Sequence, residues 1–397
     1  MMKTKIAFIL ILFLSFALLF SGTGESFVYA EETDGGQTQQ TSAEELIEEI
    51  DLSGLEEYFA TLNDNQKSLF GTSLYDYLKK IVNGDFEFGY SSFFTYMLST
   101  LGVSLAEILP MLISIIAVSV LISFIGGMKG SFASQSVDGI VNFAGIALVS
   151  AIVLLQVFSA IRDTSALVMT LKTQMEAVFP VLFTLMTALG ASGSIAIYQP
   201  AVAVLAFSVT ELVSAIALPM LIITIVFSVV GNLSSATKLG GMAKFFVSAA
   251  KWILYTSFFL FLAFLSVQGI TAAVYDNISV RTAKFALSKY VPVIGGYLSE
   301  GFNVILAGTV LIKNAVGLTA VIIMFVSVVP VLFKVIAVSL SLKLAGALTE
   351  PFEGGKVCGL LGSVSSSVNL LVAVILGMVF LYFVFLILII ASGNLVL

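Results

Sequence analysis

A long succession of apolar segments, from about Leu105 to Ile390, dominates the sequence. Because a helix needs about 20 consecutive apolar residues to cross the hydrocarbon core of a bilayer, this length accommodates roughly six to eight membrane segments. Only 11% of all residues are charged, against about a quarter in a soluble protein. The sequence therefore predicts an all-α, polytopic helical membrane protein and excludes a soluble enzyme.

Few side chains in the sequence suit catalysis or metal binding. The chain has no histidine and a single cysteine, Cys358. It therefore cannot form a Cys/His zinc site, a Ser-His-Asp triad or an internal disulfide. It has no G-x-S-x-G, P-loop or dinucleotide-binding motif. A net charge of -6 gives no reason to expect a nucleic-acid partner. We expect no enzyme activity, no cofactor and no metal.

The first 30 residues are typical of a secretory signal peptide. Lys3 and Lys5 precede an apolar run, and Ala30 ends a small-residue cleavage pattern. An uncleaved membrane anchor is the alternative. Both interpretations place the residues that follow on the extracytoplasmic side.

An acidic segment follows the signal peptide, with 14 acidic and 3 basic residues between positions 31 and 90. Residues 31–41 lack apolar side chains and are predicted to be a disordered linker. Residues 42–100 are predicted to be a helical extracytoplasmic segment, and residues 101–397 the polytopic transmembrane domain. The acidic face of the helical segment is either a partner-binding surface or a solubilising one. Its glutamates are Glu44, Glu45, Glu48, Glu49, Glu56 and Glu57.

Three Gly-Gly pairs divide the membrane region at intervals of 114 residues. They are Gly126 and Gly127, Gly240 and Gly241, and Gly354 and Gly355. Each pair lies between two apolar segments and is expected to form a loop. An amphipathic stretch and a weaker apolar segment follow, containing Pro180 in the first unit and Pro292 in the second. We interpret this order as an internal repeat of about 114 residues, with coincidence as the alternative.

Three parts of the membrane region have irregular patterns. The stretch 200–230 contains Pro219 and is expected to hold one tilted or broken helix. The weaker segments 177–197 and 291–312 contain several glycines and are expected to be either re-entrant or spanning. The number of crossings is then six or eight, so both ends of the mature chain lie outside. If the weaker segments are re-entrant, counting lysines and arginines places Lys334 on the cytoplasmic side and Arg162 outside; if both segments cross, the count barely distinguishes the two sides.

Two ionisable residues lie within apolar sequence, Glu211 and Lys313. An ionised side chain in hydrocarbon costs about 3 kcal/mol or more unless it is paired or hydrated. One hypothesis is that the two residues form an ion pair or line a common polar seam inside the bundle. The alternative is that each lies near a helix end and extends its charge into the interface.

Three short segments carry a resemblance to a known family. They are GDFEF at residues 84–88, VPVIGGYLSE at residues 291–300 and KNAVGL at residues 313–318. Together with the signal peptide and the acidic segment, they resemble the stage III sporulation protein AE family of endospore-forming Firmicutes. The resemblance extends from about residue 42 to the C-terminus.

The resemblance implies a mother-cell protein in the membrane around the forespore. It implies membership of a multi-protein channel or secretion-like complex that joins the two cells after engulfment, with other stage III sporulation membrane proteins as partners. No catalytic residue is implied. Small residues such as Gly362 and Ser363 favour close helix packing or an oligomer in the lipid bilayer. A stand-alone secondary transporter is the alternative, because such proteins also combine repeats, broken helices and buried charges.

Overall fold

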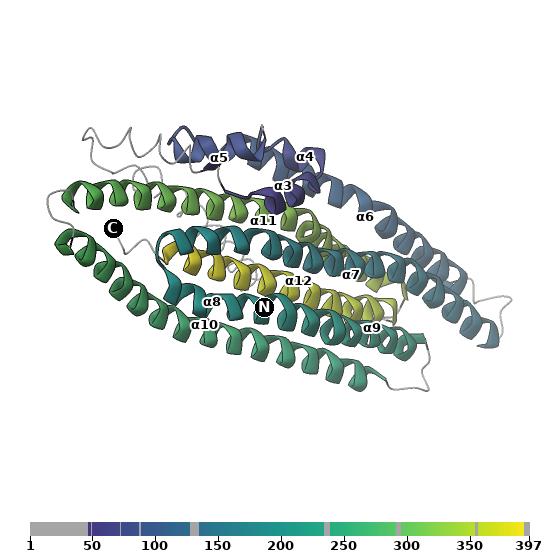
Figure 1. Cartoon of the computed structure of the whole chain (residues 1–397). Helices are drawn as coiled ribbons and strands as arrows, with labels where there is room; N and C mark the ends of the chain where they lie inside the picture. The colour runs from purple at the N-terminus through teal and green to yellow at the C-terminus, as the bar shows by residue number, and fades with distance from the viewer. Residues whose placement is uncertain are drawn as a thin grey trace.

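The computed structural model describes residues 47–392, except residues 49, 72, 87–88, 128–134, 234–238, 291–294 and 354–355. All elements in this part of the chain are helices, which confirms the predicted all-α class. The long helices run alongside one another in an elongated bundle (Figure 1). The predicted signal peptide and linker, together with Glu44, Glu45, Glu49 and Pro292, lie outside the described residues.

Between residues 50 and 86 of the described chain, three short helices precede the bundle: α3 (Ser53–Ala60), α4 (Asp64–Lys67) and α5 (Leu74–Val82). The Asn63 side chain caps the start of α4, and the Ser73 side chain caps the start of α5. Side-chain oxygens at these positions satisfy backbone N–H groups that have no partner within the helix.

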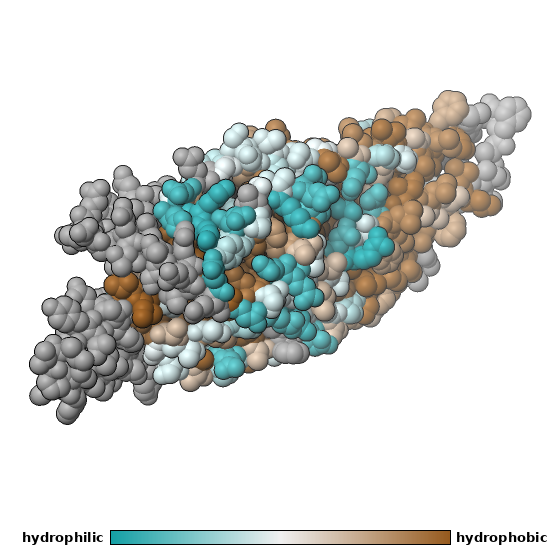
Figure 2. All heavy atoms as spheres, turned by 45° about the horizontal axis from the view of Figure 1, so that its top comes forward, coloured by the Kyte–Doolittle hydropathy of each residue, from teal (hydrophilic) through white to brown (hydrophobic). Residues whose placement is uncertain are grey.

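The short helices share a compact aromatic core. Phe70 packs edge to face against Phe59 and Tyr77, with ring centroids 5.1 and 5.0 Å apart, and Tyr77 packs likewise against Phe86 at 5.3 Å. Through this core and its neighbours, α3 contacts α7 and α5 contacts α11 of the bundle. Figure 2 shows polar side chains gathered over these N-terminal helices and apolar side chains toward one end of the bundle. The short helices are therefore part of the same packed body.

Five helices are unusually long: α6 (Tyr90–Gly127), α7 (Gln135–Ala188), α10 (Gly240–Tyr290), α11 (Gly295–Glu353) and α12 (Lys356–Ala391). The longest three have 54, 51 and 59 residues. At 1.5 Å per residue each is about 75 to 90 Å long, whereas the hydrocarbon core of a bilayer is about 30 Å thick. These three helices therefore extend beyond the hydrocarbon core.

Six helical stretches among the described residues are long and apolar enough to cross a membrane. They are Tyr90–Ile125, Gly139–Ala188, Leu212–Leu233, Gly240–Val267, Asn303–Phe352 and Val357–Ala391. This confirms the predicted polytopic helical class and matches the lower of the two expected numbers of crossings.

The stretch between α7 and α10 is an irregular helix. It consists of α8 (Ser192–Ala203), two π-helical segments, η2 (Val204–Val209) and η3 (Leu212–Ala217), and α9 (Leu218–Leu233). Proline lacks the N–H that would bond the carbonyl four residues earlier. Pro219 thus leaves the η3 residue Ala215 without that donor. The predicted irregularity between residues 200 and 230 takes this π-helical form.

The two weaker apolar segments do not form separate units in the described part of the chain. Residues 177–188 continue α7, which turns at Gly190, with φ of 73°, and leads into α8. Residues 295–312 are the first part of α11. Whether these segments are re-entrant or spanning stays a prediction. A proline such as Pro180 is tolerated within a helix that neighbouring helices hold in place.

The junctions α6–α7, α9–α10 and α11–α12 lie at the same end of the bundle (Figure 1). Gly126 and Gly127 are the last residues of α6, and Gly240 and Gly241 are the first of α10. Gly354 and Gly355 fall between α11 and α12, outside the described residues. Two of the Gly-Gly pairs thus belong to helix ends beside a junction. The internal repeat itself stays a prediction.

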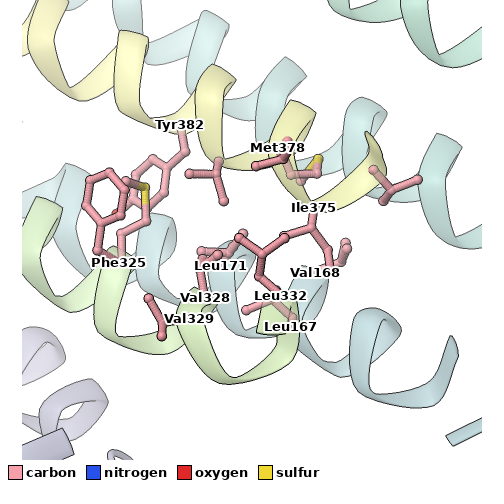
Figure 3. Packing of buried hydrophobic residues seen from close by; sticks show 14 of the residues in the cluster. Leu167, Val168, Leu171, Phe325, Val328, Val329, Leu332, Ile375, Met378 and Tyr382 are labelled. Carbon is pink, nitrogen blue, oxygen red and sulfur yellow. The ribbon is translucent and has the colours of Figure 1, made fainter. Parts of the chain in front are cut away.

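The centre of the bundle is formed by α7, α11 and α12. Side chains from these helices interlock, as Leu171, Val328 and Met378 illustrate (Figure 3). In its most apolar window α11 is 72% buried, against 22% for α10. An apolar helix that neighbours enclose on most sides belongs to the protein interior rather than to a lipid-facing surface. The contacts of α11 therefore determine how the other helices are placed.

Candidate functional site

Lys313 lies fully buried at the interface of α11, α12 and α8. Its ammonium group donates a hydrogen bond to the backbone carbonyl of Ser392, just beyond the end of α12. The Ser392 hydroxyl oxygen lies 3.3 Å from the hydroxyl oxygen of buried Tyr198 on α8. Three helices thus meet in one buried polar cluster, which we name the α12 cap: Lys313, Ser392 and Tyr198.

The α12 cap has a clear electrostatic basis. The last carbonyl groups of a helix have no N–H partner within that helix, and they carry the negative end of the helix dipole. The ammonium group of Lys313 satisfies one of these carbonyls and places a positive charge at the favourable end of α12. Lys313 lies well inside its own helix. The alternative that it is placed near an end of its own helix is therefore wrong.

Glu211 has a different environment. It lies between the two π-helical segments and is exposed on the surface of the protein. The neighbouring hydroxyls of Thr210 and Ser214 are buried and have no hydrogen-bond partner among the described residues. The ion pairs found in the described part of the chain do not join Glu211 to Lys313. Their pairing, or a shared polar seam, stays a prediction.

The sequence reasoning missed a second charged cluster, formed around Lys334 on α11. Its ammonium nitrogen lies 2.6 Å from Asp163 Oδ2 and 3.1 Å from Ser159 Oγ, both on α7. Glu107 Oε2, on α6, lies 3.7 Å away. One lysine thus links three helices through two carboxylates. The signal available in the sequence was Glu107, an acidic residue inside an otherwise apolar span.

This cluster corrects part of the expected topology. The lysine and arginine count placed Lys334 on the cytoplasmic side and Arg162 on the opposite side. Because Asp163 follows Arg162 directly and forms an ion pair with Lys334, these residues lie at the same level of the bundle. That assignment is therefore wrong. Counting loop charges failed here because both residues lie within long helices rather than in loops.

The glutamates of the predicted acidic face are only partly within the described residues. Glu48, Glu56 and Glu57 are exposed. Glu48 accepts a hydrogen bond from the Tyr75 hydroxyl at 2.9 Å and lies 3.8 Å from the Lys79 ammonium. One of the three thus has partners within its own segment, and a role for this face in binding another protein stays a prediction.

Metal-binding chemistry has no visible basis in the described part of the chain, which contains no group of three or more His, Cys, Asp or Glu side chains placed to hold an ion. Lys334 instead connects α11 to α6 and α7, and Lys313 connects α11 to the end of α12. These polar contacts thus satisfy the carbonyl at one helix end and hold neighbouring helices together inside an apolar bundle.

Comparison with known proteins gives consistent results. The family model "Stage III sporulation protein AE" matches residues 72–393. Stage III sporulation protein AE of Bacillus subtilis (strain 168) is 26% identical over 368 residues, which cover 92% of each chain. No solved structure matches the chain.

Proposed function

The chain belongs to the stage III sporulation protein AE family, and on this premise we propose that it is a non-enzymatic membrane component of a channel or secretion-like complex that joins mother cell and forespore after engulfment. The observation that carries the proposal is the family match over residues 72–393. It is supported by six helices apolar enough to cross a membrane.

The proposal includes a location and partners. The protein is placed in the mother-cell membrane around the forespore, with its N-terminus extracytoplasmic. Other stage III sporulation membrane proteins are its partners. The exposed glutamates Glu48, Glu56 and Glu57 would face the space between the two membranes. An acidic surface in that position suits a basic surface on a partner domain.

A gene deletion in the sporulating host tests the proposal, combined with purification of a tagged, functional copy. We expect development to arrest after engulfment and other stage III membrane proteins to co-purify. An unrelated mother-cell membrane protein with the same tag is the control for non-specific capture. Normal spores together with the absence of specific partners would contradict the proposal.

A stand-alone secondary transporter is the second candidate, and the π-helical segments around Glu211 favour it. Discontinuous helices and charges at membrane depth form the substrate sites of many transporters. Purified protein in lipid vesicles would then take up a specific substrate without any partner. Direct pairing of Glu211 with Lys313 further predicts that exchanging the two charges restores assembly lost in each single alanine variant. Failure of the exchange would exclude direct pairing.

A further inference from the structure

One backbone carbonyl in the middle of α11 accepts two hydrogen bonds from outside its own helix. The carbonyl oxygen of Val326 lies 3.2 Å from Gln66 Nε2 and 2.9 Å from the Tyr96 hydroxyl oxygen. Both donors are buried, and they lie 260 and 230 residues away in the sequence. A carbonyl inside a helix normally accepts its bond from the N–H four residues later. This one therefore requires an explanation.

Pro330 supplies the explanation. It lies inside α11, four residues after Val326, and has no N–H to donate. The carbonyl of Val326 would therefore be a buried acceptor without a partner, which is unfavourable in an apolar interior. Gln66 and Tyr96 replace the missing donor. The proline thus makes an acceptor available at one defined position on an otherwise regular helix surface.

Gln66, the donor that comes from the short N-terminal helices, is oriented by a separate interaction. Gln66 Oε1 accepts the backbone N–H of Asn63 at 3.0 Å, and Gln66 N donates to Asn63 Oδ1 at 2.9 Å. This capping box occupies the oxygen of the Gln66 amide. Its NH₂ group is then directed toward Val326. A four-residue helix thereby holds the donor in position.

We propose that Pro330 makes the carbonyl of Val326 an acceptor site that fixes the N-terminal helices α3–α5 on the membrane bundle. The start of α6 is fixed at the same point through Tyr96. The acidic segment is then held in one orientation against α11 and α7 instead of being tethered as an independent domain. This docking does not depend on the proposed function.

Hydrogen exchange of the α5 amides in the full-length purified protein measures how often the segment opens. Each lost hydrogen bond contributes about 1 kcal/mol, so Gln66→Ala and Tyr96→Phe should each speed exchange about 5-fold. Together they should speed it by more than about 30-fold, because only the double variant leaves the Val326 carbonyl without a donor. In a Pro330→Ala background the residue 330 N–H bonds Val326 within the helix. The combined effect should then fall to about 3-fold or less. Gln66→Ala also removes the capping box, but this loss acts equally with Pro330 and with Pro330→Ala. The difference in exchange rate between the two backgrounds therefore reports the acceptor site alone.

Two controls complete the test. Pro180→Ala removes a proline from another long helix and should leave the effects of Gln66→Ala and Tyr96→Phe unchanged. If Pro330→Ala does not yield folded protein, Tyr96→Phe is compared with Tyr58→Phe, because the buried hydroxyl of Tyr58 has no hydrogen-bond partner within the part of the chain that the structure describes. Equal effects in the two backgrounds, or no greater effect for Tyr96→Phe than for Tyr58→Phe, would overturn the proposal.

Discussion

Tyr58, on α3, has a buried hydroxyl with no hydrogen-bond partner among the described residues. The hydroxyl of Ser327 on α11 is also buried without a hydrogen-bond partner among these residues. A buried polar group without a partner costs about 1–3 kcal/mol, and removing it relieves that cost. We predict that Tyr58→Phe raises the free energy of unfolding by about 1 kcal/mol, measured by thermal unfolding in detergent. Tyr90→Phe, at an exposed tyrosine, should change it little. Clear destabilisation by Tyr58→Phe would mean that its hydroxyl has a partner.

Burial also makes the N-terminal helices sensitive to alkaline pH. Burial, by removing water from the phenol, raises the pKa of Tyr77 and also that of Tyr58. A tyrosine whose pKa is higher in the folded protein than the unfolded value of about 10 stabilises the fold below pH 10. That contribution is lost as the pH rises through the folded pKa.

We therefore predict that α3–α5 lose protection from protease between about pH 10 and the folded pKa values of these tyrosines. In Tyr58→Phe one of the two buried phenols is absent, so the loss should begin at a higher pH. Protease cleavage within residues 53–82 after brief alkaline exposure is the measurement. An unchanged midpoint in the variant would contradict the prediction.

The ion pair between Lys334 and Asp163 is half-way between a surface pair and a buried one, with side chains 22% and 29% exposed. Breaking a fully buried pair costs about 3–5 kcal/mol, and an exposed pair contributes less than about 1 kcal/mol. We predict that Lys334→Met or Asp163→Asn lowers the free energy of unfolding by about 1–2 kcal/mol.

The double variant should lose less than the sum of the two single variants, because no unpaired charge remains. Lys172→Met is the matched control, since Lys172 pairs with Glu176 on the same helix at 3.8 Å. Its effect should be below about 0.5 kcal/mol. Strictly additive single effects would show that Lys334 and Asp163 are not coupled.

At the scale of helices, glycine determines how closely α12 approaches α10. A Cβ atom on Gly377 would overlap the ring of Phe258, whereas a Cβ atom on Gly362 of the same helix would meet nothing. Small residues permit such close approach in membrane helices. Overpacking a well-packed site costs about 1–3 kcal/mol.

We predict that Gly377→Ala lowers the free energy of unfolding by about 1–3 kcal/mol. Gly362→Ala should be neutral or stabilising by up to about 1 kcal/mol, because alanine is the better helix former. Thermal unfolding of both variants in the same detergent measures the difference. Equal effects would mean that α10 and α12 do not approach each other closely at Gly377.

Local patterns predicted the elements better than their contacts. Hydropathy predicts an all-helical membrane protein, and the prolines predict the irregular helix that ends in α9. Each of these signals comes from neighbouring residues. The partners of Lys313 and Val326 could not be found in this way. Ser392 lies 79 residues from Lys313, and Gln66 lies 260 residues from Val326. Such contacts depend on how helices pack, which no local periodicity specifies.

The charged clusters show the same limit. Lys313 was recognised as an unusual residue because of its apolar neighbours, but its role as the cap of α12 follows only from the three-dimensional arrangement. Lys334 directly follows an apolar span, and its sequence neighbours give no sign of an ion pair. Its ion pairs with α6 and α7 became visible only when those helices were placed beside α11.

At the scale of the whole molecule, six stretches are long and apolar enough to cross a membrane, and if they cross in alternation the two ends of the bundle lie on opposite sides. The α6–α7, α9–α10 and α11–α12 junctions share one end (Figure 1). Lys129, Lys238 and Lys356 lie in or directly beside these junctions in the sequence. Lysines near the ends of membrane helices favour the cytoplasmic side. We therefore predict that the junction end lies in the cytoplasm and the short N-terminal helices lie on the opposite side.

Cysteine labelling tests this orientation because the chain has only Cys358, which Cys358→Ser removes. In that background we predict that Ser68→Cys, at an exposed position beside α4, reacts with a membrane-impermeant maleimide in intact cells. Ser131→Cys and Ser235→Cys, in the first two junction regions, should react only after the membrane is permeabilised. Labelling of both junction positions in intact cells would reverse the orientation. Labelling of only one would mean that an odd number of crossings separates the two junctions, which six alternating helices do not allow.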